Sequence, residues 1–342
     1  MRRTGIVIDE EYKLHDPGRG HPESPARLES IERQLETTGL TEKMVRVPAR
    51  PASQEEICLV HDESYFRRVA GTAGHRMMLD PDTVTSEHSF SAALKAVGGL
   101  LELVKSVVAG ELDNGYALVR PPGHHAERGR AMGFCLFNNV AVAAEHALGQ
   151  LGLERVAIVD WDLHHGNGTM HSFHDRADVL YVSTHQYPYY PGTGALDDTG
   201  SGAGRGRTVN IPLPTGMDDG AFFRIYQQVV VPVLRDFAPQ LLLVSTGYDI
   251  YRGDPLGGMR VSVEGFGALT GLLLQAAQDC CDGRLVLVLE GGYDLEGLAG
   301  GVASACGVLL GSEQPQQFSD QYQLAGDIIE KVVQVQKEYW NI

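Results

Sequence analysis

The sequence predicts a single α/β domain with a mostly parallel central sheet and helices on both of its faces. Short apolar runs recur along the 342 residues, and none of them alternates cleanly with polar residues. Such continuous runs are typical of parallel strands that are buried on both sides. Helical patterns lie between several of the runs, and no Pro/Ser-rich or charged linker divides the chain, which favours one domain over residues 1–342.

The individual elements follow from the spacing of the apolar residues. Five runs are predicted as strands, over residues 116–119, 156–159, 179–182, 241–244 and 285–289. Three- and four-residue apolar spacing predicts a helix over 89–108, ended by Gly110. Further helices are expected over 139–148 and 221–237, the second after the candidate caps Asp218 and Asp219. Residues 323–339 are amphipathic, so the C-terminal stretch 313–342 is expected to be a helical tail packed on the domain.

Composition excludes several classes of protein. The chain has 44 acidic and 28 basic residues, a formal charge of -16, which argues against a general nucleic-acid binder. No apolar run approaches the roughly 18 residues of a membrane span, so we expect no membrane segment. The five cysteines are scattered and form no C-x-x-C pair, which predicts neither a disulfide framework nor a thiolate zinc site. A reducing, cytoplasmic location is therefore expected.

Polar side chains follow four of the five predicted strands. The four segments are R-P-P-G-H-H at 120–125, D-W-D-L-H-H-G-N-G at 160–168, S-T-G-Y-D at 245–249 and E-G-G-Y at 290–293. Ligands of open α/β sheets bind outside the carboxyl ends of the strands, so these segments are the first candidates for a functional site.

The second of these segments has the spacing of a metal site. Side chains two residues apart share a face of an extended chain, so Asp160, Asp162 and His164 can point the same way. Together with Asp249 they offer carboxylates and an imidazole, a set that suits Zn²⁺, with Fe²⁺ or Co²⁺ as alternatives. Taken singly, an aspartate after a strand is more often a helix cap. The coincidence of several such residues favours a metal site that hydrolyses amides.

The chain resembles the histone deacetylase family, in particular its class II branch and the bacterial histone deacetylase-like amidohydrolases. Seven motifs carry the resemblance, in order along nearly the whole chain. They are H-P-E-S-P-A-R at 21–27, R-P-P-G-H-H at 120–125, G-F-C-L-F-N-N at 133–139, D-W-D-L-H-H-G-N-G-T at 160–169, P-G-T-G at 191–194, G-D-P-L-G-G at 253–258 and E-G-G-Y at 290–293.

The resemblance implies an arginase-like α/β fold and a zinc-dependent deacetylase with one Zn²⁺ per chain. It assigns the zinc ligands to Asp162, His164 and Asp249. It further implies a potassium ion beside the zinc loop, at Asp160, Asp162, His164 and Ser183.

The resemblance also assigns the catalytic groups. His125 is expected to be the general base and then the acid for the leaving amine, with His124 as its electrostatic partner. Asp160 is expected to hold His124, and Asn167 takes the corresponding place beside His125. Tyr293 is expected to donate its hydroxyl to the oxyanion.

The substrate tunnel of the family is narrow and walled by aromatic residues. Its expected lining here is Gly133, Phe134, Tyr190 and Leu256. Tyr190 stands where the family usually has Phe, which adds a hydroxyl to the wall. The loops over 18–25 and 80–88 are expected to form the rim, with Asp82 as a substrate-selecting residue.

These residues favour removal of an acetyl or similar short acyl group from a lysine-like amine. An acetylpolyamine deacetylase is the alternative, since the acidic charge suits a polyamine. Polyamine-selective eukaryotic relatives carry an acidic gatekeeper where this chain has Leu256, which ranks that alternative second. A non-catalytic acyl-ligand binding module is less favoured because no ligand and no catalytic group is missing. A binuclear manganese ureohydrolase would need more carboxylates than this chain places at the site.

Overall fold

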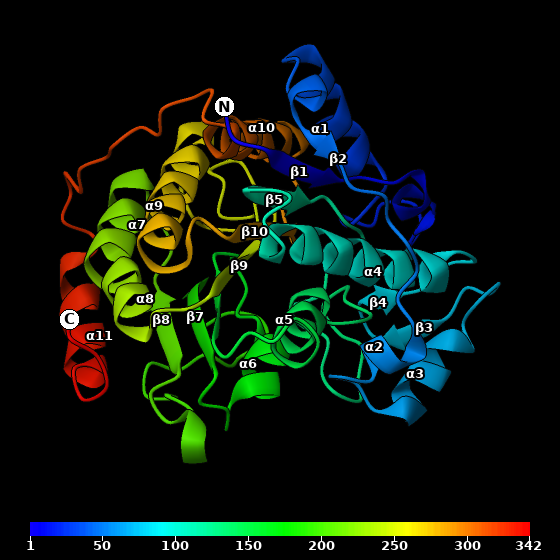
Figure 1. Cartoon of the computed structure of the whole chain (residues 1–342), viewed down its shortest axis with the longest axis horizontal. Helices are drawn as coiled ribbons and strands as arrows, with labels where there is room; N and C mark the ends of the chain where they lie inside the picture. Colours follow the sequence, from blue (N-terminus) through cyan, green and yellow to red (C-terminus); the bar gives the residue numbers. More distant parts are fainter.

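The central element of the protein is an eight-stranded, fully parallel sheet (Figure 1). The computed structural model describes all residues, 1–342. The strand order is β2-β1-β5-β10-β9-β6-β7-β8. The bounds are β1 Thr4–Val7, β2 Val45–Arg46, β5 Asn114–Ala117, β6 Val156–Asp160, β7 Val179–Gln186, β8 Thr208–Leu213, β9 Leu241–Thr246 and β10 Leu285–Leu289. The predicted fold class, a single α/β domain around a parallel sheet, is confirmed.

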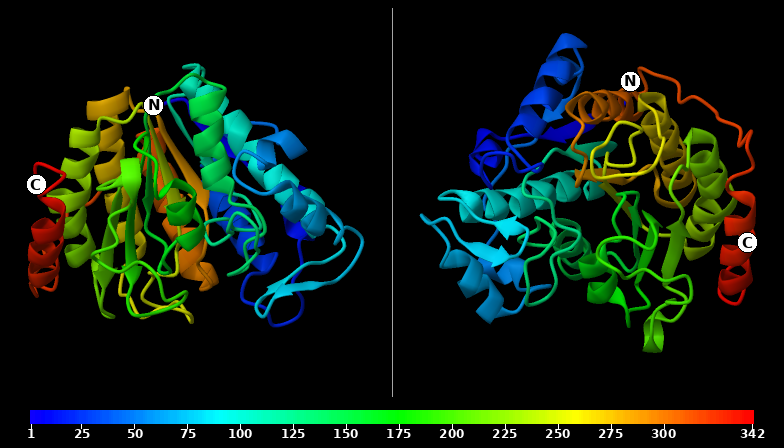
Figure 2. Two further views of the ribbon diagram at one scale, coloured as in Figure 1. Left: turned by 90° about the horizontal axis from the view of Figure 1, so that it is seen from below. Right: turned by 180° about the vertical axis from the view of Figure 1, so that it is seen from behind.

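Helices cover both faces of this sheet, as the edge-on view in Figure 2 shows. On one face α4 (Ser89–Val108) packs on β1, β5 and β10, and α5 (Asn139–Gly149) packs on β6 and β9. On the other face α9 (Val263–Cys281) packs on β9 and β10, beside α10 (Leu295–Leu310). Every residue of β6, β9 and β10 is buried, which explains why their sequences are apolar up to the polar residues at the carboxyl ends of β6 and β9.

The remaining elements lie around these two layers. They are α1 Ala26–Thr37, α2 Gln54–Ile57, α3 Glu63–Ala70, α6 Asn167–Phe173, α7 Asp219–Ile225, α8 Val231–Phe237 and α11 Gly326–Gln336. A two-stranded antiparallel ribbon joins β3 Met78–Asp80 and β4 Thr83–Val84. No helix of the structure combines the length and the hydropathy that crossing a bilayer requires.

Several predicted elements continue past their predicted ends, β7 by four residues to Gln186, and two differ in more than their last residues. The first strand spans Asn114–Ala117, two residues before the predicted 116–119, because Asn114 and Gly115 pair with both β1 and β10. An Asn-Gly pair has the composition of a turn, so only its position between two strands reveals it as strand. The predicted helix over 221–237 begins at Asp219 and contains a π-helical turn over Tyr226–Val230.

Of the two candidate caps of that helix, only Asp218 has this role. Its side chain accepts a hydrogen bond from the backbone N–H of Ala221. The carboxylate of Asp219 instead accepts from the backbone N–H of Ser262, at the start of α9. Asp219 therefore ties α7 to α9 rather than capping its own helix.

The C-terminal segment contacts the sheet edge at β8. Helix α11 packs against β8, and Gln336 Nε2 donates to the carbonyl of Thr208 at 3.4 Å. Trp340 is 5% exposed, and its indole N–H donates to the carbonyl of Gly206 at 3.0 Å. These contacts cover the outer side of an edge strand that would otherwise be open.

The strand order brings four polar strand ends to one place. Strands β5, β10, β9 and β6 are consecutive neighbours and all run parallel, so their carboxyl ends meet at the same edge of the sheet. These are the strands that precede the four polar segments of the sequence.

Candidate active site

Three potential metal ligands come together at this edge of the sheet. One ligand atom each of Asp162, His164 and Asp249 can be chosen so that all lie within 4.8 Å of one another. His164 Nδ1 is 3.0 Å from Asp249 Oδ2 and 3.3 Å from Asp162 Oδ1. Asp162 and His164 follow β6, and Asp249 follows β9, the neighbouring strand. One divalent ion can therefore be held by all three side chains.

Backbone N–H groups hold the two carboxylates in place. Asp162 Oδ2 accepts from Gly291 N at 2.8 Å, and Asp249 Oδ1 accepts from Leu163 N at 2.9 Å. A Cβ atom at Gly291 would lie 2.6 Å from both Asp162 Oδ2 and Asp249 Oδ2. Position 291 therefore requires glycine because any larger residue would push the two carboxylates away from each other.

The charges of this cluster fit a cation. Burial and the neighbouring charge of Asp162 raise the pKa of Asp249 to about 7. Burial disfavours the charged form of His164, but hydrogen bonds to Asp162 and Asp249 outweigh it and raise its pKa to about 9. Two carboxylates buried this close together resist being charged at the same time, which a bound cation would relieve. A buried set of oxygen and nitrogen donors suits a divalent ion such as Zn²⁺.

A pair of histidines lies beside the metal-ligand cluster. The rings of His124 and His125 are 4.0 Å apart, and both side chains are buried. His124 Nδ1 lies 3.0 Å from Asp160 Oδ2, while His125 Nδ1 lies 2.8 Å from Asn167 Oδ1. The structure thus places the two expected partners, one carboxylate and one amide, against the two imidazoles.

The different partners give the two imidazoles different charges. Burial opposes protonation of His124, but the carboxylates of Asp162 and Asp160 outweigh it and raise its pKa to about 10. Burial and the positive charge of His124 hold the pKa of His125 well below its usual value. In this environment His124 is a cation and His125 is a neutral imidazole, which is the form that can accept a proton.

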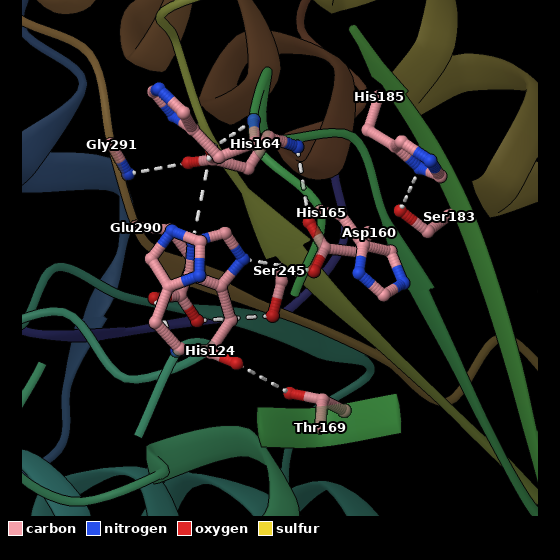
Figure 3. Close-up of polar contacts among 12 residues, drawn as sticks. His124, Asp160, His164, His165, Thr169, Ser183, His185, Ser245, Glu290 and Gly291 are labelled. Atoms are coloured by element: carbon pink, nitrogen blue, oxygen red, sulfur yellow. Dashed lines mark hydrogen bonds and ion pairs between the residues drawn. The ribbon is translucent and has the colours of Figure 1, made fainter. Parts of the chain in front are cut away.

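A buried glutamate, Glu290, fixes the strand end that carries the histidine pair. Its Oε2 accepts from the backbone N–H groups of Gly123 and His124 at 2.7 and 3.1 Å, and its Oε1 accepts from Ser245 Oγ (Figure 3). Burial raises the pKa of Glu290 to about 7. No role of Glu290 is predicted from the sequence. Its position directly after β10, in the E-G-G-Y segment, was the available signal.

A cavity of about 90 Å³ joins these groups. Its lining residues are Asp82, Pro122, His124, His125, Gly133, Phe134, Asp162, His164, Tyr190, Leu256, Gly291 and Tyr293. All four residues expected in the tunnel wall are among them. Tyr190 lies edge-on to His125 at 5.2 Å, and Phe134 lies edge-on to Tyr293 at 6.0 Å.

The turn at Gly133 and Phe134 brings an aromatic wall close to His125. A Cβ at Gly133 would lie 2.3 Å from His125 Cδ2, so only glycine allows this approach. Phe134 has φ of 67°, a left-handed conformation that is costly for a bulky residue. Thr83 Oγ1 accepts from Phe134 N at 3.1 Å, and Asp82 Oδ1 accepts from Gly133 N at 3.2 Å. The rim loop therefore holds the strained turn in place.

Tyr293 faces the cavity from the end of β10. Asp254 Oδ2 accepts from the backbone N–H of Tyr293 at 2.6 Å, and the guanidinium of Arg27 lies 5.2 Å from the phenol ring. Arg27 is itself fully buried and donates to the carbonyls of Gly292 and Glu290. Arg27 belongs to the H-P-E-S-P-A-R motif, but its hydrogen bonds to the E-G-G-Y segment are not predicted from the sequence.

The residues expected to bind potassium also lie together. Asp160 and Ser183 are directly paired across β6 and β7, and Asp162 and His164 continue from the end of β6. Asp160 Oδ2 also accepts a hydrogen bond from Tyr181 Oη at 3.1 Å. Tyr181 is not predicted from the sequence as part of this group, because its contact joins residues of different strands.

Comparison with known proteins agrees with these observations. Residues 21–309 match the family model described as "Histone deacetylase domain". A "Probable deacetylase" of Archaeoglobus fulgidus is 40% identical over 296 residues, which cover 86% of this chain and 82% of the relative. "Histone deacetylase 9" of Homo sapiens is 39% identical over 348 residues, covering 91% of this chain but only 34% of that longer protein. The crystal structure of the HDA15 HD domain superposes with a TM-score of 0.92 at 36% identity, covering 99% of this chain and 95% of the other. This chain belongs to the histone deacetylase family.

Proposed function

We propose that the protein is a zinc-dependent amide hydrolase that removes acetyl or a similar short acyl group from a lysine-like amine. The observation that carries the proposal is the convergence on one cavity of a three-residue metal cluster, a histidine pair and a tyrosine. A metal-activated water, a proton acceptor and an oxyanion donor are the parts that amide hydrolysis requires.

The zinc ligands in this proposal are Asp162, His164 and Asp249. When bound, the ion supplies a lowered pKa for a water molecule and polarisation of the substrate carbonyl. The tight spacing of the three ligand atoms and the burial of the two carboxylates support this assignment. We also propose a potassium ion at the neighbouring group of Asp160, Asp162, His164 and Ser183, supported by the pairing of Asp160 with Ser183.

The chain's own residues then have separate tasks. His125, held neutral, accepts a proton on Nε2 and later returns it to the leaving amine. The cationic His124, hydrogen-bonded to Asp160, stabilises negative charge that develops beside it. Tyr293 donates its hydroxyl to the oxyanion, and the lowered pKa of His125 keeps its imidazole unprotonated, so that Nε2 is free to accept a proton.

The cavity favours a short acyl group on an aliphatic amine. Its volume of about 90 Å³ corresponds to the space of a few water molecules. Phe134 and Tyr190 offer aromatic faces to an aliphatic stem, and Leu256 offers no charge to a second ammonium group. These features rank a lysine-like substrate above an acetylpolyamine.

We further propose a cytoplasmic location, supported by five cysteines that are all unpaired.

The test is a turnover panel of acylated lysine peptides and acetylpolyamines on the zinc-loaded protein. His125→Ala and Tyr293→Phe should each lower kcat by at least about a hundredfold while zinc content stays at one per chain. Unchanged turnover in both variants would contradict the mechanism. A strong preference for acetylspermidine would replace the lysine-like substrate with the polyamine alternative.

A further inference from the structure

A line of hydrogen bonds continues from His125 toward the surface of the protein. His125 Nδ1 lies 2.8 Å from Asn167 Oδ1, and Asn167 Nδ2 donates to Glu127 Oε1 at 2.5 Å. The same carboxylate oxygen lies 2.8 Å from His171 Nδ1. His125 and Asn167 are buried, whereas the side chain of His171 is 46% exposed. Glu127 therefore links a buried imidazole–amide pair to a histidine at the surface.

The surroundings of Asn167 determine which end of its amide faces His125. The oxygen and nitrogen of an amide have nearly the same shape, so the neighbouring donors and acceptors decide the orientation. Three acceptors surround Nδ2: the Glu127 carboxylate at 2.5 Å, the His125 carbonyl at 3.4 Å and the Met132 sulfur at 3.4 Å. Only the carboxylate is at the distance of a strong hydrogen bond. Glu127 thus holds the nitrogen on its own side and leaves the oxygen for His125.

The orientation of the amide fixes the tautomer of His125. An amide oxygen only accepts hydrogen bonds, so His125 Nδ1 must carry the proton and donate it. The lone pair of the neutral ring is then on Nε2, the nitrogen that the proposed function uses as the base. A rotated amide would present its NH₂ group to Nδ1 and favour the opposite tautomer, whose Nε2 already carries a proton.

We propose that Glu127 is a positioning residue that sets the base-competent tautomer of His125 through Asn167. The proposal rests on the proposed function insofar as it takes His125 to be the base. The two histidines of the pair then use carboxylates differently. Asp160 contacts His124 directly, whereas the carboxylate that serves His125 is one side chain further away. An amide in between orients the ring without placing an anion against it.

Glu127 is itself well placed for this task. Burial favours its neutral form, but His171, Asn167 and Arg130 outweigh this effect and lower its pKa, so the carboxylate is charged. Its backbone carbonyl accepts from His61 Nδ1 at 2.9 Å, and its backbone N–H donates to the carbonyl of Arg130 at 2.9 Å. The backbone and the side chain are therefore both anchored.

The test compares two replacements of nearly equal size, Glu127→Gln and Glu127→Met. In Glu127→Gln an amide oxygen can still accept from Asn167, whereas Glu127→Met retains the length of the side chain without a strong acceptor. The tautomer of His125 is read from ¹⁵N chemical shifts of the histidine-labelled, zinc-loaded protein, with His125→Ala identifying the signals. Steady-state kinetics on an acetyl-lysine peptide provide kcat and KM.

Wild-type protein should show a proton on Nδ1 and none on Nε2 of neutral His125. Glu127→Met should populate the other tautomer and lose about tenfold to a hundredfold in kcat with little change in KM. Glu127→Gln should keep the wild-type tautomer and lose no more than about threefold. Glu154→Ala, at an exposed glutamate away from the site, is the matched control and should change neither quantity.

A wild-type tautomer in Glu127→Met, or a proton on Nε2 of neutral His125 in the wild type, would overturn the proposal. Equal loss of kcat in both Glu127 variants with the tautomer unchanged would overturn it as well. If the wild-type protein hydrolyses no acylated amine, the proposed function fails, but the ¹⁵N measurement still decides whether Glu127 sets the tautomer.

Discussion

Replacing Gly291 with alanine should weaken metal binding by a purely steric route. A Cβ at this position lies 2.6 Å from Asp162 Oδ2 and from Asp249 Oδ2, whereas ordinary van der Waals contact begins at 3.4 Å. Each oxygen must therefore move by about 0.8 Å, several times the roughly 0.2 Å tolerance of metal–ligand distances. Both carboxylates are buried and held by backbone N–H groups, which leaves little room for adjustment. Gly291 does not have a positive φ, so alanine adds no backbone strain.

We expect Gly291→Ala to bind zinc about tenfold to a hundredfold more weakly than the wild type. This is a loss of about 1.4 to 3 kcal/mol in binding free energy. The affinity is measured by competition with a chromophoric chelator, and thermal unfolding of the metal-free protein checks that the variant folds. Gly149→Ala is the matched control because a Cβ there meets nothing within 4 Å. Wild-type zinc affinity in a folded Gly291→Ala protein would refute the assignment of Asp162 and Asp249 as ligands of one ion.

Three further predictions concern stability. Burial lowers the pKa of His61 to about 4, and its Nε2 accepts from the backbone N–H of Asn138. The unfolded chain binds this proton at about pH 6.5, so folding stability that is complete above pH 6.5 should fall by about 3 kcal/mol toward pH 4. Urea unfolding should show this loss, and a wild-type pH slope in His61→Gln would contradict it. Leu287→Ala, in the fully buried strand β10, should cost about 2 to 5 kcal/mol in the same assay. Leu324→Ala, at a 38% exposed position, should cost under about 1 kcal/mol. Trp340→Ala should free the C-terminal segment, which faster amide exchange in α11 would report and unchanged exchange would disprove.

Local patterns in the sequence were sufficient for the elements with a strong apolar signal. The helix predicted over 89–108 and the strand predicted over 285–289 have the same bounds in the structure. The helix has a periodic apolar signal because one of its faces packs on the sheet, and the strand has a continuous one because helices cover both faces of the sheet. Strands β1 and β8 lack that signal: Thr4–Val7 is four residues long, and Thr208–Leu213 contains Asn210 and Pro212. Their place in the sheet comes from pairing with neighbours, which short-range periodicity does not encode.

The sequence alone also named most residues that the structure brings together around the cavity, because they lie in recognisable motifs, several of which directly follow a strand. It did not reveal that β5, β10, β9 and β6 are neighbours, since strand order depends on long crossovers and on which faces the helices bury. Nor did it reveal the supporting contacts of Glu127 and Glu290, whose hydrogen bonds span 40 and 167 residues of the chain. A hydrogen bond between distant residues leaves no periodic trace in a sequence. Residue types and their strand-end positions were therefore determined locally, whereas the orientation of the side chains was decided by tertiary packing.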